Sequence, residues 1–306
     1  MHIRTSHLLG VAAALTLSVS MTAAVAAAQD GDRNEKSSAS HTRPCTNASA
    51  AGTFGYRMNG VIVGVGPFLV NGLFTHHPNG TMDADVELVV GYNSFPLRST
   101  GGTFRTNRDC TGSGRFPAPS LLPVDVEYNF ILTDDGNQIE LLNTNLGVVL
   151  QGISRRISKP DRAPRCRADM VVGSYGYRLE GSVSGLPNVA VAGLIRQALK
   201  HPDDNTGTFS GSDTMSLMGG FIDRPIENGT FTVGGNCRGY GSYKTIDPTD
   251  SSRTKRITIN YVFTVVNDGD TLFLQGSDPD TAIFGVAQRV QSSNAEKEHE
   301  QGGRWR

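Results

Sequence analysis

A short motif occurs twice in this chain of 306 residues, each time just after a cysteine. Gly52-Thr-Phe-Gly-Tyr-Arg-Met-Asn-Gly60 follows Cys45, and Gly173-Ser-Tyr-Gly-Tyr-Arg-Leu-Glu-Gly181 follows Cys166. The offset between the copies is 166 − 45 = 121 residues, far longer than the period of a solenoid repeat. We therefore predict that a whole domain has been duplicated.

The match continues along both copies with two increases in the offset. Gly80-Thr81 matches Gly207-Thr208 at an offset of 127, and Tyr128 matches Tyr261 at an offset of 133. Both insertions fall in turn-like segments, where extra residues cost little loop entropy. The copies are predicted to span 45–157 and 166–290, with a linker at 158–165.

Apolar and polar residues alternate with a period of two in both copies, which is typical of strands with one buried face. Tyr56 and Met58 fall on one face of the first such segment, and Arg57 and Asn59 fall on the other. Turn signals divide the first copy into segments at 52–63, 67–76, 80–91, 95–107, 111–117, 124–134, 138–144 and 147–156.

Short hairpin connections between these segments favour an antiparallel meander, and closure into a barrel removes exposed sheet edges. We therefore predict an all-β protein of two tandem antiparallel up-and-down β-barrels, each of about eight strands. Two β-sandwiches are the alternative.

The two ends of the sequence differ in composition from the copies. Residues 1–28 have a basic start, an apolar run and Ala26-Ala27-Ala28 before Gln29, which predicts a signal peptide. An uncleaved membrane anchor is the alternative, because the apolar run approaches the length that spans a bilayer. Residues 29–44 are charged and Ser-rich, and 291–306 are polar, so we expect a disordered stalk and tail. The expected location is secreted or periplasmic, with no membrane span after cleavage.

The four cysteines lie at matching positions, two in each copy. In an exported protein this pattern predicts a disulfide framework. Three pairings are possible, and the duplication favours Cys45–Cys110 and Cys166–Cys237, because a single ancestral domain needed an internal partner. Metal ligation is the rival interpretation, and the absence of any Cys-x-x-Cys or Cys/His cluster argues against it.

Charge and motifs exclude several functional classes. A formal net charge of −1 gives no electrostatic footprint for nucleic acid. The sequence has no Gly-x-Ser-x-Gly, phosphate-binding or His-Glu-x-x-His motif, so we predict no cofactor and no metal. His76 and His77 are adjacent on one strand and therefore point to opposite faces. Oligomeric state is not determined by the sequence.

Inward-facing aromatic side chains are the candidate ligand contacts, because a tyrosine hydroxyl inside a barrel can orient a small apolar molecule. The alternative is that they simply fill the cores. The predicted ligand-binding residues are Tyr56, Tyr128, Phe130, Tyr177, Tyr261 and Phe263.

Acid/base catalysis would require carboxylates inside a barrel. Asp85, Glu87 and Glu127 form the set predicted to be available for it, whereas their counterparts in the second copy are Ser212, Thr214 and Asn260. Among the basic residues, Arg57 and Arg178 are expected on the outer face. Arg156 and Arg289, at the ends of the copies, are expected to form salt bridges or cover apolar surface.

Three features carry a family resemblance: the Gly-[Thr/Ser]-[Phe/Tyr]-Gly-Tyr-Arg opening, the Asp109-Cys-Thr-Gly112 turn and the Phe130-x-Leu-x-Asp-Asp-Gly136 hairpin. On these, each copy resembles exported bacterial β-barrel proteins that are similar to the barrel of allene oxide cyclase and dirigent proteins. The resemblance implies that a small hydrophobic ligand sits in the barrel. The catalytic polar residues of those relatives match no positions here, so cyclase activity is not carried over.

These observations predict an exported, non-catalytic protein that binds a small apolar ligand or a surface partner in or on its barrels. An allene oxide cyclase-like isomerase acting within one barrel is the first alternative. A structural or adhesive module with solid cores is the second.

Overall fold

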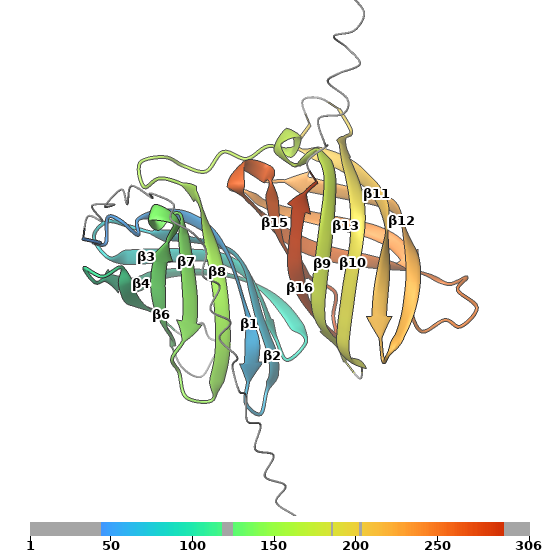
Figure 1. Ribbon diagram of the computed structural model, residues 1–306, viewed down its shortest axis with the longest axis horizontal. Helices are drawn as coiled ribbons and strands as arrows, with labels where there is room; N and C mark the ends of the chain where they lie inside the picture. Colours follow the sequence, from blue (N-terminus) through green and yellow to red (C-terminus); the bar gives the residue numbers. More distant parts are fainter. Residues whose placement is uncertain (1–43, 118–124, 185, 202–203, 291–306) are drawn as a thin grey trace, which may run out of the picture. The chain divides into compact units, whose positions relative to one another are not determined.

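The computed structural model describes residues 44–117, 125–184, 186–201 and 204–290. These residues form two closed antiparallel β-barrels in tandem, each of eight strands (Figure 1). The predicted fold is therefore confirmed, and the β-sandwich alternative is wrong. The predicted signal peptide and tail, and all but Pro44 of the predicted stalk, lie outside the described residues.

The first barrel follows the predicted segments closely. Its strands are β1 (Gly52–Ile62), β2 (Gly66–His76), β3 (Thr81–Val90), β4 (Asn93–Thr106), β5 (Thr111–Phe116), β6 (Val126–Thr133), β7 (Gln138–Asn143) and β8 (Val148–Ser158). Each strand pairs with the next, and β8 returns to pair with β1. Closure of this kind leaves no edge strand unpaired.

The second barrel repeats this order. Its strands are β9 (Gly173–Val183), β10 (Leu186–Leu199), β11 (Thr206–Leu217), β12 (Gly220–Val233), β13 (Arg238–Ile246), β14 (Arg256–Val266), β15 (Thr271–Gly276) and β16 (Thr281–Arg289). Here β16 pairs with β9 to close the sheet. The helices of the described residues are three short 3₁₀ turns, η1 (Asp134–Gly136), η2 (Ala168–Val171) and η3 (Asn267–Gly269). None of them is long or apolar enough to cross a membrane.

Each barrel encloses its own apolar core, and the alternation of side chains decides which residues enter it. In β1, Phe54, Tyr56 and Met58 are buried in the first core. Their equivalents Tyr175 and Tyr177 in β9 are buried in the second core. Arg57 and Arg178, one residue out of phase, lie on the outer faces as predicted, and Arg178 is exposed.

The two ends of each barrel differ. At one end, which we call the closed end, a segment preceding the first strand lies under the hairpins and is held by a disulfide. The bonds are Cys45–Cys110 and Cys166–Cys237, with Cα–Cα distances of 5.0 and 4.8 Å. The predicted pairing is confirmed. The opposite end, where β13 connects to β14 and β15 to β16, is called the open end.

Side chains of the two barrels also contact each other. The Arg238 guanidinium lies 2.5 Å from the Asp85 carboxylate and 3.5 Å from that of Glu87. The Asn71 amide donates to the Phe273 carbonyl at 2.9 Å. The Arg57 guanidinium lies 5.6 Å from the centre of the Phe273 ring, a cation–π contact. The outer faces of β1 to β3 therefore bind the second barrel through polar as well as apolar groups.

These contacts correct the expectation about carboxylates. Asp85 and Glu87 do not point into the first barrel; they point outward, to Arg238. The Glu127 side chain is 52% exposed and lies 4.0 Å from Arg115. The reason is their phase: in β3 the buried inward positions are Ala84, Val86 and Leu88, which alternate with the acids. The predicted acid/base set is wrong.

Candidate functional site

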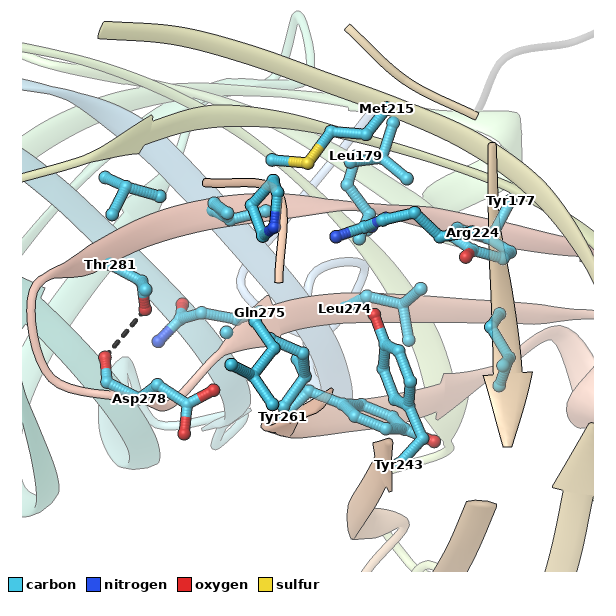
Figure 2. Close-up of a pocket in the computed structure, with 18 of the residues that line it drawn as sticks. Tyr177, Leu179, Met215, Arg224, Tyr243, Tyr261, Leu274, Gln275, Asp278 and Thr281 are labelled. Atoms are coloured by element: carbon cyan, nitrogen blue, oxygen red, sulfur yellow. Dashed lines mark hydrogen bonds between the residues drawn. The ribbon is translucent and has the colours of Figure 1, made fainter. Parts of the chain in front are cut away.

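The second barrel is hollow, and the first is nearly filled. A cavity of about 260 Å³ lies inside the second barrel, whereas the space that Tyr56 and Tyr128 border inside the first is about 50 Å³. The cavity wall is mostly apolar and includes Val191 and Ile259. Figure 2 shows Leu179, Met215 and Leu274 on the same wall. At the open end it reaches Asp278 and Thr281, where the Thr281 hydroxyl donates to the Asp278 carbonyl at 2.6 Å. The cavity therefore extends from the core to the rim.

Loss of aromatic rings explains why the two copies differ. In the first barrel the Phe74 ring packs against the rings of Phe54 and His76, with distances between ring centres of 5.3 and 4.6 Å. His76 in turn stacks on Phe104 at 4.0 Å. At the offset of 121, Phe74 becomes Ile195 and His76 becomes Gln197. Smaller or more flexible side chains at these positions leave space that the first barrel fills with rings.

A row of four residues crosses the wall of the hollow barrel on adjacent strands. Tyr177 in β9 is paired with Gly193 in β10, Gly193 with Asp213 in β11, and Asp213 with Arg224 in β12. The Asp213 and Arg224 side chains are 0% and 5% exposed. Two ionic groups therefore face inward, where the alternation of the first copy places only apolar ones.

Asp213 is fully engaged by its neighbours. The Arg224 guanidinium donates to both carboxylate oxygens, from Nε at 2.8 Å and from Nη2 at 3.0 Å. The Tyr177 hydroxyl donates to Oδ2 at 2.7 Å. A two-point arginine–carboxylate contact with a further donor is the arrangement that makes a buried ion pair tolerable.

Gly193 makes this contact possible. A Cβ atom at this position would lie 2.7 Å from Asp213 Cβ and 2.8 Å from Tyr177 Cε1, closer than real Cβ atoms approach. Because Gly193 has no side chain, the Tyr177 ring crosses β10 and its hydroxyl reaches the carboxylate on β11. The glycine recurs as Gly72 in the first copy.

The same row in the first barrel is apolar. There, Tyr56 pairs with Gly72, Gly72 with Val86, and Val86 with Leu97. At an offset of 127, Val86 corresponds to Asp213 and Leu97 to Arg224. The fold is therefore able to form at these positions without charges, and the ion pair is a feature of the second copy alone.

Burial and the ion pair set the protonation states in the cavity wall. Burial alone would lower the pKa of Arg224, but the hydrogen bonds and charge of Asp213 outweigh it, so the pKa of Arg224 is raised. Burial raises the pKa of Tyr177 far above its ordinary value, and the neighbouring Tyr243 and Asp213 raise it further. Arg224 is thus a cation and Tyr177 a neutral hydrogen-bond donor.

Further polar groups face the cavity. Tyr243 and Tyr261 line it with their rings 6.3 Å apart, and among the described residues their hydroxyls have no protein hydrogen-bond partner. Burial raises the pKa of both tyrosines. Gln197 is 4% exposed, lines the cavity, and its Oε1 is buried without a hydrogen-bond partner. Such unpaired groups are uncommon in protein interiors.

The structure places the predicted ligand-binding residues as follows. Tyr56 and Tyr128 border the small space in the first barrel, and Phe130 is buried in the same core. Tyr177, Tyr261 and Phe263 line the large cavity of the second barrel. All six are inside, but their contact with a ligand stays a prediction.

The sequence analysis missed Asp213, Arg224, Tyr243 and Gln197. Asp213 is in phase with Phe209 and Met215, which are both buried, so the alternation within β11 carried the signal. A comparison of inward positions between the copies would have found the exchange of Val86 for Asp213. Asp213 and Arg224 differ from their counterparts in the first copy, so the residues that the copies share do not reveal them.

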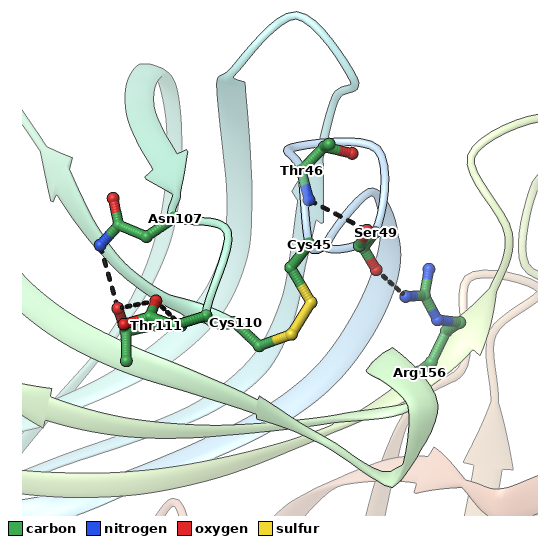
Figure 3. Close-up of a disulfide and its surroundings, with 8 residues drawn as sticks. Cys45, Thr46, Ser49, Asn107, Cys110, Thr111 and Arg156 are labelled. Atoms are coloured by element: carbon green, nitrogen blue, oxygen red, sulfur yellow. Dashed lines mark hydrogen bonds between the residues drawn. A yellow bond between two sulfur atoms is a disulfide. The ribbon is translucent and has the colours of Figure 1, made fainter. Parts of the chain in front are cut away.

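The closed end of the first barrel depends on Arg156 (Figure 3). Its guanidinium donates to the Ser49 carbonyl at 2.8 Å and the Gly136 carbonyl at 2.6 Å, and also to the Ala51 carbonyl. It lies 4.7 Å from the centre of the Phe54 ring. Arg156 therefore ties the segment after Cys45 to the last strand, which is a structural role.

Arg289 performs the same task in the second barrel. It donates to the Met170 carbonyl at 2.6 Å and to the Asp270 carboxylate at 2.9 Å, and lies 5.0 Å from the centre of the Tyr175 ring. Both the expected salt bridge and the expected cover of apolar surface are present here. At the closed end of the first barrel, Arg156 donates to backbone carbonyls and not to a carboxylate.

His76 is expected to make the stability of the first barrel depend on pH. Burial, opposed by a hydrogen bond with the Ala50 carbonyl, lowers the pKa of His76 from 6.5 to about 3. The unfolded chain therefore binds a proton that the folded chain does not, and folding stability is lost as the pH falls from 6.5 towards 3.

We expect His76→Gln, which copies Gln197 of the second barrel, to remove this pH dependence. The slope of the unfolding free energy should fall by roughly 1 kcal/mol per pH unit over that range. Urea unfolding of both proteins at several pH values measures it. Equal slopes for wild type and variant would contradict the assignment.

Comparisons with known proteins add little to this description. The sequence matches no family model and no curated protein. Among solved structures, the chain is similar to a protein of unknown function of the DUF3598 family from Nostoc punctiforme. The two sequences are 8% identical, the alignment covers 80% of this chain and 98% of that one, and the TM-score is 0.25.

Two further structures show likenesses of the same level. Transferrin binding protein B from serogroup B Neisseria meningitidis has 8% identity over 79% of this chain and 77% of that one, with a TM-score of 0.26. A protein described as an outer membrane protein from Bacteroides fragilis has 14% identity over 80% and 100%, with a TM-score of 0.22. TM-scores this low carry no argument. None of the three names an allene oxide cyclase or dirigent protein, so that resemblance stays a prediction.

Proposed function

We propose that this chain is an exported, non-catalytic binding protein that holds one small apolar ligand inside its second barrel. The main support is the difference in cavity volume between the copies, which is about 260 Å³ in the second barrel and about 50 Å³ in the first. An apolar cavity with a few polar groups is the usual form of a small-molecule site. The first barrel then serves as a filled structural partner.

The two disulfides fit a protein that folds outside the reducing cytoplasm. They support the exported part of the proposal.

Size limits the ligand. An engineered cavity of about 150 Å³ accepts benzene, so by that scale a cavity of 260 Å³ holds roughly ten non-hydrogen atoms. The ligand is therefore a compact hydrocarbon skeleton or a short chain.

The chemistry of the wall supports binding over catalysis. A general base needs a carboxylate free to accept a proton, but both Asp213 oxygens already accept hydrogen bonds from Arg224. Tyr177 also donates to Asp213, and its raised pKa keeps it protonated. These groups are arranged to orient a bound molecule, not to move protons.

Filling the cavity should abolish binding without loss of folding. Ile195→Phe restores the ring that the first barrel carries as Phe74, and Ile195 lines the cavity. We expect naphthalene, a fluorescent hydrocarbon of suitable size, to bind the wild type and to bind the variant at least about ten-fold more weakly, since the ring occupies the ligand's space. Fluorescence titration measures this.

Leu194→Phe is the matched control, because Leu194 is the neighbouring residue on the outer face and is 52% exposed. It should leave naphthalene binding unchanged. Absence of binding to the wild type, or equal loss in both variants, would overturn the proposal. Native mass spectrometry of the exported protein provides a second test, with an added mass expected in the wild type and missing in Ile195→Phe.

A further inference from the structure

We infer that the ligand of the second barrel is electrically neutral and carries one oxygen, a hydroxyl, carbonyl or ether, that accepts a hydrogen bond from Arg224. This inference rests on the function proposed above and specifies its ligand class. It comes from four side chains of the wall: Asp213, Arg224, Tyr243 and Gln197.

The comparison between the copies shows that packing does not require three of these polar groups. The first barrel holds Val86, Leu97 and Phe116 at the positions of Asp213, Arg224 and Tyr243, whereas the position of Gln197 holds the polar side chain of His76. That barrel closes with the same strand order and the same register at the row of four residues. Burial of an ion pair in place of apolar side chains is often neutral or unfavourable for stability. The exchange therefore has its explanation in what the second barrel contains.

Arg224 keeps donors for a ligand. Its guanidinium has five N–H groups, and Asp213 accepts from Nε and Nη2. Among the described residues, Nη1 has no protein acceptor, and Arg224 lines the cavity. Figure 2 shows Arg224 on the same cavity as Met215 and Tyr243. Three N–H groups are therefore left, and a ligand oxygen at this wall would accept from one of them.

The charge of the ligand follows from the ion pair. Asp213 already neutralises Arg224, so beside this pair a ligand carboxylate would leave one negative charge buried without compensation. The other carboxylates of the lining, Asp247 and Asp278, lie at the open end, where Lys255 pairs with Asp247 and the Asn260 amide donates to Asp278. A ligand ammonium beside Arg224 would face its cation and would also be uncompensated. A neutral ligand with an acceptor oxygen meets neither penalty.

The other polar groups agree with a ligand of this class. The hydroxyls of Tyr243 and Tyr261 are each able to donate and to accept a hydrogen bond. Gln197 lines the same cavity, and its buried Oε1, which accepts only, has no partner among the described residues. A ligand hydroxyl is therefore able to donate as well as accept, which makes an alcohol the best match.

Four ten-carbon probes test the inference on the full chain: decane, decyl alcohol, decanoate and decylammonium, each kept below its aggregation concentration at neutral pH. Displacement of naphthalene gives the dissociation constants. We expect decyl alcohol to bind at least about ten-fold more tightly than decanoate or decylammonium, and more tightly than decane, because only it avoids a buried charge and meets Arg224.

Two variants locate the preference. Asp213→Val/Arg224→Leu, which copies the first barrel, should bind decane as well as the wild type does and lose the preference for decyl alcohol over decane. Tyr243→Phe copies Phe116, changes no charge, and should reduce the preference by a smaller factor. It keeps the test valid if the double variant does not fold.

The outcomes separate the two claims. If neither naphthalene nor any ten-carbon probe binds, the proposed function fails. If decane or decanoate binds as tightly as decyl alcohol, the function stands and the neutral, oxygen-bearing ligand is excluded. If both variants still prefer decyl alcohol over decane, then Arg224 and Tyr243 do not bind the ligand oxygen, and the inference is wrong.

Discussion

Asp213→Val is expected to destabilise the second barrel by about 3–5 kcal/mol, because it leaves the Arg224 guanidinium buried without its partner. The side chains of the pair are 0% and 5% exposed, so water could reach the orphaned cation only from the cavity. Tyr177 also loses the acceptor of its 2.7 Å hydrogen bond. Hydrogen exchange of the β11 and β12 amides reports the loss for this barrel alone, and calorimetry reports the fall in its melting temperature.

The double variant Asp213→Val/Arg224→Leu is the decisive control. It installs the Val86–Leu97 pair of the first barrel in the same register, so no charge is buried. We expect it to recover the loss and to equal or exceed the wild type by about 1–4 kcal/mol. A single variant as stable as the wild type would show that the pair is solvated. A double variant as unstable as the single one would mean that the cavity wall needs the charges in order to fold.

Removal of the Cys45–Cys110 disulfide is expected to have a similarly large effect on the first barrel. The bond closes a loop with a sequence separation of 65 residues. Replacement of both cysteines by alanine should cost about 4 kcal/mol on the loop-entropy model. The Ser49 carbonyl, in the segment that the disulfide holds, also accepts a hydrogen bond from Arg156 (Figure 3). Because this segment forms the closed end, we expect the closed end to loosen first.

Calorimetry of the variant and of wild type treated with reductant tests this expectation. Both should show the transition of the first barrel at a lower temperature, and reductant should shift that transition no further in the variant. In the variant without reductant, the intact Cys166–Cys237 bond of the second barrel provides an internal reference. An unchanged first transition in Cys45→Ala/Cys110→Ala would mean that the Arg156 contacts alone hold the closed end.

Much of the fold is predictable from the sequence because strands and closure depend on local patterns. The period of two places Tyr56 inside and Arg57 outside, and the structure agrees. The hairpin residues fixed the strand ends to within a few positions. The duplication favours, among three possible pairings, the cysteine pairing that the structure has, because a single ancestral domain needed an internal partner.

The site was less predictable, for two physical reasons. The first is phase: Asp85 and Glu87 alternate with Val86, so their strand directs them outward, whereas Asp213 occupies the Val86 position and points inward. The second is volume. Whether a barrel is hollow depends on how side chains from eight strands pack together, and an exchange such as Phe74 for Ile195 has its effect only in that packing.

The arginine at the end of each barrel has a consequence for biogenesis. Arg156 and Arg289 come from the last strands, β8 and β16, yet each binds backbone that precedes the first strand of its copy. Neither barrel can therefore close until its last strand has been synthesised. Contacts between residues so far apart in the sequence also form slowly. Under the export that we propose, the chain would cross the membrane before these arginine contacts form, and its cysteines would be oxidised on the far side.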